Sequence, residues 1–249
     1  MIELTLIGIG TGNPDHITMQ AARAMNAANL ILIPRKGEAK SDLVDLRRDI
    51  CAQVLAATVR IVEFDMPVRD AGGDYAQGVQ AWHDAIAAVW REEIARHLPA
   101  GGKLALLVWG DPSLYDSTLR IAERLPGVKV SVVAGITSIQ ALTAAHAIPL
   151  NPLAGSVVIT TGRRLRAHGW PPGADTVVVM LDGGCAFEAL DPAGVSIWWG
   201  AYLGMEHQAL ESGPLARMAP LIAGRRARLR ARHGWIMDVY LMRKEPSNG

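Results

Sequence analysis

Short apolar runs alternate with longer amphipathic segments through the first half of the chain. Each apolar run is typical of a buried parallel strand, and the segments between the runs have helical periodicity. Thr18 is expected to cap the first helix and Pro34 to end the second strand. The alternation favours a parallel, doubly wound α/β sheet. Strands are predicted over residues 4–9, 30–33, 59–62, 103–109 and 128–133, and helices over 18–29, 41–57, 75–98 and 113–125.

The pattern changes in the second half of the chain. A helix is still predicted over 136–147, but Pro149, Asn151 and Pro152 then interrupt the chain. Later strands, separated by shorter helices and more turns, are predicted over 156–161, 176–181, 195–202 and 235–242. We therefore expect two α/β domains, an N-terminal doubly wound, mostly parallel sheet over residues 1–135 and a C-terminal mixed sheet over 136–249.

Composition and charge narrow the class of protein. The 249 residues are half hydrophobic with a net charge of +1, which allows a sizeable core and gives no general attraction to nucleic acid. Cys51 and Cys185 lie far apart and outside any metal-ligand spacing, which favours a reducing cytoplasm and no metal. The segment from Met1 to Leu4 does not open a signal sequence, and no run of 18 apolar residues is present, so no membrane span is expected.

The most informative segment is Val108–Tyr115, a Gly-Asp-Pro turn that follows a predicted strand. Ligands bind open α/β sheets at the carboxyl ends of their strands. Gly110 allows close approach of the backbone to a ligand, Pro112 stiffens the turn, and Ser113 is expected to cap the next helix. An ordinary strand-to-helix turn would look the same, so this segment alone does not decide the function.

Two further strand ends carry glycines. The first loop, Gly8–Asp15, resembles a dinucleotide fingerprint, but Asn13 replaces its last glycine and Pro34 follows the second strand where a ribose-binding acid is required. The third strand end, Val132–Ser138, places Thr137 and Ser138 at the start of a helix, where free N–H groups suit a carboxylate or hydroxyls of a ligand. An ordinary helix N-cap is an equally good interpretation of either residue. Three such ends in one parallel sheet converge on one crevice and predict a small-molecule site.

Six arginines lie between Arg217 and His233. Charged runs of this kind are usually a solvated loop or helix face. A local anion-binding patch is the alternative interpretation.

The order of these motifs resembles the tetrapyrrole (corrin and sirohaem) methyltransferase family. The resemblance rests on Gly-x-Gly-x-Gly, then Gly-Asp-Pro-Ser-x-Tyr, then Gly-Ile-Thr-Ser, then a strand ending in Met180, and it covers nearly the whole chain. It implies two α/β domains with a cofactor cleft between them, S-adenosylmethionine as methyl donor with S-adenosylhomocysteine as product, a polyanionic tetrapyrrole substrate and a homodimer. The segments 33–47, 199–204 and 233–238 resemble a branch that methylates C1 of precorrin-5 and releases acetate in aerobic cobalamin biosynthesis.

The resemblance also implies which residues contact the cofactor. Gly110 and Asp111 would do so largely through their backbone. The full implied set is Thr11, Trp109, Gly110, Asp111, Ser113, Leu114, Thr137, Ser138, Met180, Tyr202, Leu203 and Gly234.

Two positions depart from the family pattern. The first loop reads Gly10-Thr11-Gly12-Asn13 where relatives have Gly-Pro-Gly-Asp, so the acid proposed as a base in some relatives is an amide. Ala134 stands where proline is common, a change that affects loop stiffness. The predicted catalytic residues are Arg35, which matches a basic position of those relatives, together with Asp15 and Tyr115; His16 and Asp65 are further candidates to assist.

Methyl transfer from a sulfonium requires mainly alignment, which can lower a barrier by about 7–11 kcal/mol. Carboxylate arms on the substrate suit paired guanidinium donors. A rim of basic residues after strand ends or in loops is expected to bind them, although each could also be a solvated charge: Arg35, Lys36, Lys40, Arg47, Arg163, Arg164 and Arg166. A sister enzyme acting at another ring position, a nicotinamide-dependent reductase and a non-catalytic binding module remain alternatives.

Overall fold

The computed structural model describes residues 1–35, 41–56, 59–69, 72 and 74–244. The chain divides into two compact units, Met1–Thr137 and Ser138–Gly249. Each unit is built around its own five-stranded sheet.

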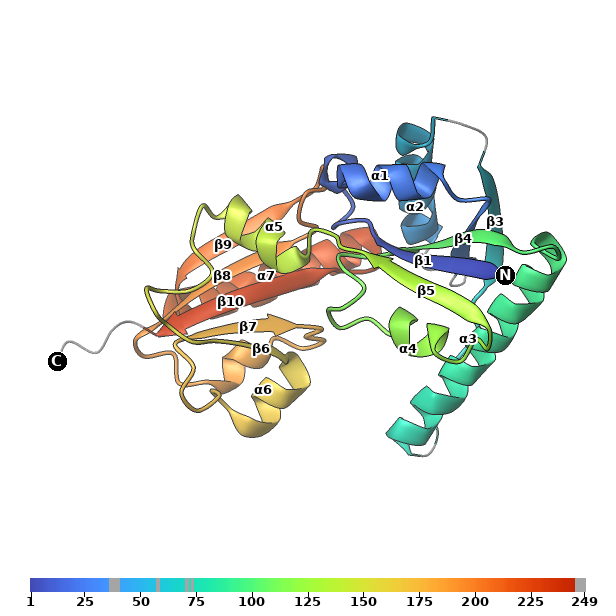
Figure 1. Cartoon of the computed structure of the whole chain (residues 1–249). Coiled ribbons are helices and arrows are strands. Elements are labelled where there is room, and N and C mark those ends of the chain that lie inside the picture. Colours follow the sequence, from blue (N-terminus) through green and yellow to red (C-terminus); the bar gives the residue numbers. More distant parts are fainter. Residues whose placement is uncertain (36–40, 57–58, 70–71, 73, 245–249) are drawn as a thin grey trace. The chain divides into compact units, whose positions relative to one another are not determined.

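The N-terminal unit contains a sheet with strand order β3-β2-β4-β1-β5. All its strand pairs are parallel, which confirms the predicted doubly wound sheet (Figure 1). The centre of the order matters for the site, because β1 pairs with β4 on one side and β5 on the other. The strands are β1 (Ile2–Gly8), β2 (Leu30–Arg35), β3 (Arg60–Asp65), β4 (Gly102–Val108) and β5 (Val128–Val133).

Helices cover both faces of this sheet and bury a separate apolar core on each face (Figure 1). Alternate strand residues point to opposite faces, so Leu106 belongs to one core and Leu107 to the other. Helices α1 (Met19–Asn26) and α2 (Ser41–Val54) pack on one face, and α3 (Tyr75–His97) and α4 (Thr118–Ala122) on the other.

Two local predictions in this unit need comparison with the structure. Thr18 caps α1 as expected, because its Oγ1 accepts the Ala21 N–H at 3.0 Å. Pro34 does not end β2, which continues to Arg35. Beyond Leu32 the strand pairs with β3 alone, and such one-sided pairing tolerates a residue without an N–H.

The helix expected over 113–125 is reduced to α4, which begins at Thr118. Ser113 is therefore not its cap. The carboxylate of Asp111 accepts the backbone N–H of Ser113 at 2.8 Å, and Tyr115 adopts a φ of 50°. Such an Asx turn competes with helix formation, so residues 112–117 form a loop.

The C-terminal unit contains the predicted mixed sheet, with strand order β6-β7-β10-β8-β9. Only β6 and β7 pair in parallel; the other three pairs are antiparallel. The strands are β6 (Val157–Thr161), β7 (Thr176–Met180), β8 (Val195–Ala201), β9 (Ala209–Pro214) and β10 (Asp238–Lys244).

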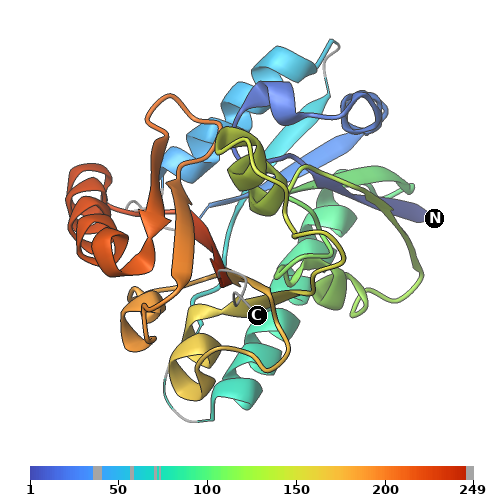
Figure 2. The same ribbon diagram turned by 90° about the vertical axis from the view of Figure 1, so that its left-hand side faces the viewer.

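The helices of this unit also pack on two faces of their sheet. Helix α7 (Leu215–His233), α6 (Gly162–His168) and the short helix η3 (Ala186–Ala189) contribute to one apolar core around Trp199. Helix α5 (Ser138–Ala145) packs against β8 and β10 from the opposite face, as the turned view in Figure 2 shows.

Strand β9 was not predicted, and the last strand begins three residues later than expected. The segment Ala209–Pro214 contains a glycine and a proline and has little apolar alternation; it pairs with β8, and Arg225 of α7 donates to Leu210 O and to Glu211. The arginine-rich segment is helical, and its face is not wholly solvated, because Arg226 is buried and pairs with Asp238 at 2.8 Å.

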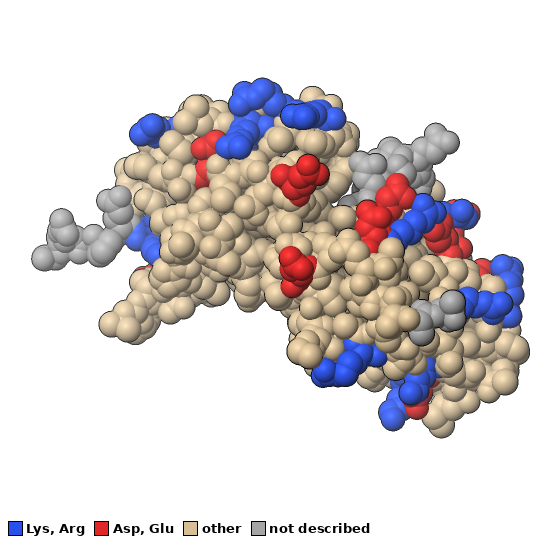
Figure 3. All heavy atoms as spheres, turned by 90° about the horizontal axis from the view of Figure 1, so that it is seen from above, with Lys and Arg blue, Asp and Glu red and all other residues tan. Residues whose placement is uncertain are grey.

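Charge is distributed in patches. On the described part of the face in Figure 3, basic and acidic side chains lie in small groups, and some of these groups contain both signs. No helix among the described residues is long and apolar enough to cross a membrane.

Gly224 offers a simple stability test. It lies inside α7, where an added Cβ would meet only the Arg228 side chain, at 3.5 Å. Glycine in a helix is less favourable than alanine by roughly 0.5–1 kcal/mol. We expect Gly224→Ala to raise the free energy of unfolding by about that amount, measured by urea denaturation. A lower midpoint at unchanged slope would contradict this.

His83 should make stability depend on pH. It lies in α3 with 2% of its surface exposed, and neither ring nitrogen has a hydrogen-bond partner among the described residues. Burial, followed by Arg124 and Arg120, lowers the pKa of His83 against a small opposing effect of Asp84. The unfolded chain therefore binds a proton at His83 more readily than the folded protein does. The neutral ring makes its full contribution to the free energy of unfolding above the unfolded pKa of about 6.5, and this contribution is lost as the pH falls.

The measurement compares thermal unfolding of the wild type and His83→Phe between pH 7.5 and pH 5, two values on either side of the histidine reference pKa of about 6.5. We expect the variant to lose less stability on acidification. Parallel curves for the two proteins would show that His83 does not carry the effect.

Candidate active site

Three loops meet at the carboxyl edge of the N-terminal sheet. They follow β1, β4 and β5, which are neighbours in the sheet. The first two loops are joined by a pair of backbone hydrogen bonds: Gly110 N–H donates to Gly10 O at 2.7 Å, and Gly10 N–H to Gly110 O at 3.4 Å. The predicted convergence of three strand ends is therefore present in this unit.

Asp111 joins the second loop to the third. One carboxylate oxygen accepts the Gly135 N–H at 2.9 Å, and the other accepts both the backbone N–H and the hydroxyl of Ser113. Burial raises the pKa of Asp111, but these hydrogen bonds outweigh burial and hold the pKa below its usual value. Both oxygens of the carboxylate are thus engaged in fixing the loops, which makes Asp111 a poor proton carrier.

Glycines line the place where the three loops touch. A Cβ on Gly8 would lie 2.6 Å from Gly135 N, and a Cβ on Gly135 would lie 2.1 Å from Gly110 O. Gly110 also has a φ of 63°, which side chains rarely adopt. The result is a surface of bare main chain, which a ligand can approach through backbone N–H and C=O groups.

The first loop orders itself through its own polar side chains. Thr11 is buried, and its hydroxyl hydrogen-bonds Nδ1 of His16 at 3.0 Å. Asn13, the residue that departs from the family pattern, accepts the Asp15 N–H at 2.9 Å and caps the short helix η1 (Pro14–His16). Asp15 is exposed on this helix. Cofactor binding by Thr11 and a catalytic role of Asp15 remain proposals.

The other two predicted catalytic residues lie in different loops. Arg35 ends β2 and pairs with Asp65 at the end of β3, with Nε 3.0 Å from Oδ1, and both side chains are largely exposed. Tyr115 is partly exposed in the loop after β4. An exposed ion pair contributes little to stability, so Arg35 remains available to exchange Asp65 for a carboxylate of a ligand.

In the C-terminal unit, the structure brings the Tyr202 and Gly234 segments together. Tyr202 donates its hydroxyl proton to Trp235 O at 2.5 Å and its backbone N–H to Met237 O at 2.9 Å. Its buried ring packs against His207, His233 and Trp235, and burial raises the pKa of the phenol. Tyr202 is therefore an anchor for the chain around Gly234.

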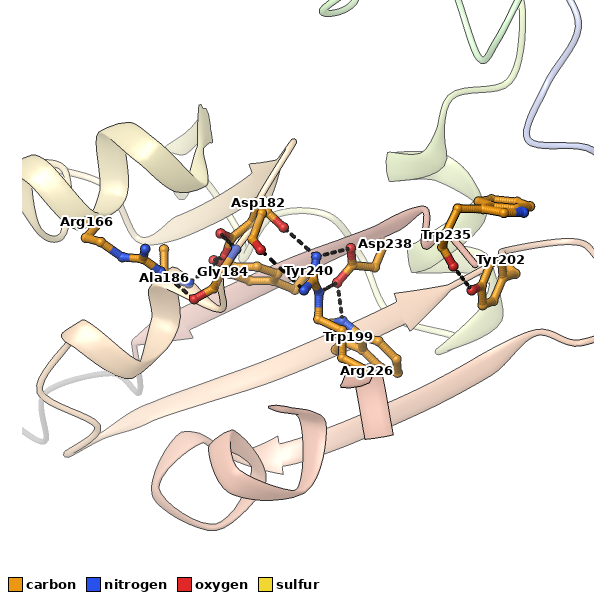
Figure 4. A network of polar contacts seen from close by, with 11 residues as sticks. Arg166, Asp182, Gly184, Ala186, Trp199, Tyr202, Arg226, Trp235, Asp238 and Tyr240 are labelled. Carbon is orange, nitrogen blue, oxygen red and sulfur yellow. Dashed lines mark hydrogen bonds and ion pairs between the residues drawn. The ribbon is translucent and has the colours of Figure 1, made fainter. Parts of the chain in front are cut away.

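Met180 ends β7 and is followed by a loop that Asp182 holds in place (Figure 4). The Asp182 carboxylate accepts the N–H groups of Gly184 at 3.0 Å and Ala186 at 2.6 Å, and the Tyr240 hydroxyl at 2.7 Å. Burial is the largest of the causes that raise the pKa of Tyr240, so it stays a neutral donor.

A buried ion pair continues this network (Figure 4). Arg226 donates to the carboxylate of Asp238 at 2.8 Å and to the backbone oxygen of Asp182 at 2.7 Å, and Trp199 Nε1 donates to Asp238 at 2.9 Å. Sequence reasoning missed these residues, because a lone arginine in a basic run and two scattered aspartates carry no local signal.

The predicted basic rim is only partly a set of loop residues. Arg47 lies in α2 and is buried, while Arg163, Arg164 and Arg166 belong to α6. Arg166 donates to the backbone oxygen of Gly184. Arg163, Arg164 and Arg166 thus follow the end of β6, as predicted, but on a helix, whereas Arg47 lies in the middle of α2 and not in a loop. Lys36 and Lys40 lie outside the described residues.

Comparison with known proteins assigns the family. A model of the Tetrapyrrole (Corrin/Porphyrin) Methylases matches residues 3–219. A "Precorrin-6A synthase [deacetylating]" of Sinorhizobium sp is 46% identical over 98% of this chain and 96% of that protein. The chain belongs to the tetrapyrrole methylase family.

Solved structures agree with this membership. A protein of Corynebacterium diphtheriae described as related to cobalamin synthesis (CobF) superposes with a TM-score of 0.84 and 37% identity, covering 98% of this chain and 99% of that one. The uroporphyrin-III C-methyltransferase of Thermus thermophilus, solved with S-adenosylhomocysteine, has a TM-score of 0.59 over 96% and 91% of the two chains. At 16% identity it supports the fold alone.

Family membership confirms several predictions. The fold class and the class of enzyme, a methyltransferase that uses S-adenosylmethionine, are those of the tetrapyrrole methylases. The alternative of a nicotinamide-dependent reductase is thereby set aside. The second strand agrees with this, because it continues after Ile33 through Pro34 and Arg35 and lacks the acid that would bind a ribose. The glycine-lined edge suits a methyl donor that is held by main-chain groups.

Gly135→Ala tests this edge of the methylase. The added Cβ would overlap Gly110 O, so the second and third loops must separate and the Asp111 hydrogen bond to residue 135 must lengthen. We expect S-adenosylhomocysteine to bind about tenfold more weakly or worse, as expected for loss of 1.4 kcal/mol or more, measured by calorimetry. Gly224→Ala, the same change without a clash, is the control and should bind like the wild type. Equal affinities for both variants would exclude a role for the glycine contact.

Proposed function

We propose that this protein is a precorrin-6A synthase (deacetylating), a corrin C-methyltransferase of aerobic cobalamin biosynthesis. It methylates C1 of precorrin-5 from S-adenosylmethionine and releases acetate to give precorrin-6A. The observation that carries the proposal is the 46% identity to the Sinorhizobium enzyme of that name, which extends over 98% of this chain. The conjunction of the glycine-rich loops, Met180 and the segments around Tyr202 and Gly234 supports it.

The methyl donor is proposed to contact Gly110 and Asp111, which present main-chain groups, together with Thr137 and with Ser138, the first residue of α5. The hydrogen bonds of Asp111 to Ser113 and Gly135 keep those groups preorganised. S-adenosylmethionine, when bound, supplies an already activated methyl group. Aligning donor and acceptor is then the main task, and alignment can supply roughly 7–11 kcal/mol of barrier reduction.

Proton transfer is assigned to residues other than Asn13. Its amide cannot take a proton, and its oxygen is engaged with the Asp15 N–H. For the release of acetate, which needs water added to an acyl group, Asp15 and Tyr115 are the proposed groups because both side chains are exposed in loops at the carboxyl edge. Arg35 is proposed to bind a carboxylate of the substrate in place of Asp65.

A homodimer in the cytoplasm is part of the same proposal. It follows from the family resemblance, and the absence of a disulfide framework among the described residues is consistent with a reducing compartment. Sedimentation equilibrium of the purified protein tests the dimer directly.

The first experiment separates the methyltransferase from a nucleotide-binding protein. The protein is titrated calorimetrically with S-adenosylhomocysteine and, separately, with NADPH, and both titrations are repeated on Gly110→Trp. We expect S-adenosylhomocysteine to bind the wild type and not the variant, because the tryptophan side chain at residue 110, where φ is 63°, would occupy the glycine-lined edge. Binding of NADPH alone would overturn the assignment.

The second experiment identifies the acceptor. Enzymatically prepared precorrin-5 is incubated with the protein and labelled S-adenosylmethionine. We expect one labelled methyl group on the ring for each acetate released. Methylation of an earlier or later intermediate without acetate would instead identify a sister enzyme acting at another ring position.

A further inference from the structure

Leu181 is unusual in two respects. Its apolar side chain is 67% exposed, and its backbone has a φ of 52°. A positive φ is uncommon outside glycine and is an outlier for a bulky side chain, because the Cβ approaches the carbonyl oxygen that follows it. Neither the exposure nor the backbone conformation favours the folded state, so the surrounding fold must impose both on this residue.

The chain is fixed on both sides of Leu181. Before it, Met180 ends β7 and pairs with the end of β6. After it, the buried Asp182 accepts hydrogen bonds through its carboxylate, and its backbone oxygen accepts one from Arg226 at 2.7 Å (Figure 4). Gly162 leaves room for Asp182, since a Cβ there would lie 2.3 Å from Asp182 Cγ. These contacts hold the loop and keep Leu181 in its strained conformation.

The outer surface of this loop is open. Leu181, Gly183 and Gly184 are exposed, whereas Asp182 between them is buried. A Cβ added to Gly183 would meet no atom of the described residues within 4 Å. Met180, beside them, is one of the residues that the family resemblance implies for the cofactor. The exposed leucine therefore follows directly on a position where a ligand is expected.

A leucine suits this position poorly unless a ligand uses it. Asparagine or glycine would adopt the positive φ more easily, and neither would expose an aliphatic side chain to water. Residues held in such sparsely populated conformations cluster at ligand-binding and active sites, where the surrounding structure keeps them in place. The combination of strain and exposure at Leu181 indicates that its side chain is kept for contact with a bound molecule.

We propose that Leu181 contacts the adenosyl group of the methyl donor. An aliphatic side chain suits the flat, largely apolar purine, whereas the methionine end of the donor carries charged groups that favour polar partners. The inference rests on the proposed function for the identity of the ligand. It adds a specific side-chain contact next to Met180.

Leu181→Asn tests the inference through two measurements that are expected to move in opposite directions. The change removes the apolar side chain and relieves the backbone, since asparagine tolerates a positive φ. We expect the melting temperature to rise. We expect S-adenosylhomocysteine to bind about fivefold more weakly by calorimetry, as expected for loss of a partly buried aliphatic contact. A residue that only supported the fold would lose stability and binding together.

Ala154→Asn is the matched control. Ala154 is also exposed, with a φ of 55°, in a different loop of the same unit. We expect Ala154→Asn to raise the melting temperature as Leu181→Asn does and to leave the binding of S-adenosylhomocysteine unchanged. Leu181→Met keeps an apolar side chain of similar volume, so its affinity should stay close to that of the wild type.

A direct measurement locates the contact. The whole protein with ¹³C-labelled leucine methyl groups is mixed with S-adenosylhomocysteine, and nuclear Overhauser effects are recorded between the methyl groups and the ligand. We expect signals that join the adenine or ribose protons to a leucine that is missing from the spectrum of Leu181→Asn. If that variant does not fold, Leu181→Met provides the assignment and the wild type provides the measurement.

Equal affinities of the wild type and Leu181→Asn for S-adenosylhomocysteine, or no such signal from Leu181, would overturn the inference while the methyltransferase assignment stands. A fall in both melting temperature and affinity in Leu181→Asn would also overturn it, because Leu181 would then be a structural residue. If S-adenosylhomocysteine does not bind the wild type, the proposed function fails and the inference fails with it.

Discussion

The contact of three main-chain segments at Gly8, Gly110 and Gly135 is the constraint on which the first unit's ligand-binding edge depends. A Cβ on Gly8 or on Gly135 would clash with the neighbouring main chain, so the loops after β1, β4 and β5 approach one another as bare backbone. Asp111 then uses its carboxylate to fix their spacing, with two backbone N–H groups and one hydroxyl as donors. The order of strands in the sheet makes this possible, because β1 lies between β4 and β5. Backbone recognition leaves the side chains around the edge free to determine which substrate is bound.

The second unit achieves local order in a different way, through buried charges whose partners are supplied from distant parts of the chain. Asp182 and Asp238 collect donors from η3, β8, α7 and β10, and Arg226 links the Asp238 carboxylate to the backbone oxygen of Asp182 (Figure 4). A buried ion pair adds little to the free energy of unfolding compared with apolar residues of the same size. Removing one partner is nevertheless destabilising, because the other charge is left buried and unpaired. Their effect here is geometric: they hold the loop that follows Met180 and the start of β10.

The tryptophans show how a residue's surroundings decide its role. Trp82 and Trp199 bury their rings and donate to a backbone oxygen and a carboxylate, respectively, so they are fully used within the fold. The indole N–H groups of Trp90 and Trp109 are buried and have no hydrogen-bond partner among the described residues, so these rings contribute through packing and, for Trp109, through its contact with the Arg47 guanidinium. The same residue type thus combines packing with a hydrogen bond in one place and contributes through ring contacts alone in another.

The sequence by itself determined the two sheets, most of their strands, the Thr18 cap and the convergence of three strand ends, because these depend on local periodicity and on the rule that parallel strands end at one edge. Family membership was also readable, since it depends on the order of short motifs. Tertiary structure decided that β2 continues through Pro34, that Ser113 serves Asp111 instead of a helix, and that Arg47 and Arg226 are buried. The Asp111–Ser113 contact is local, but the others depend on partners far away in sequence, such as Asp238 for Arg226, and Asp111 itself is also held by Gly135 of the next loop. A local pattern carries no information about such partners, because burial and hydrogen bonding are set only when distant segments pack together.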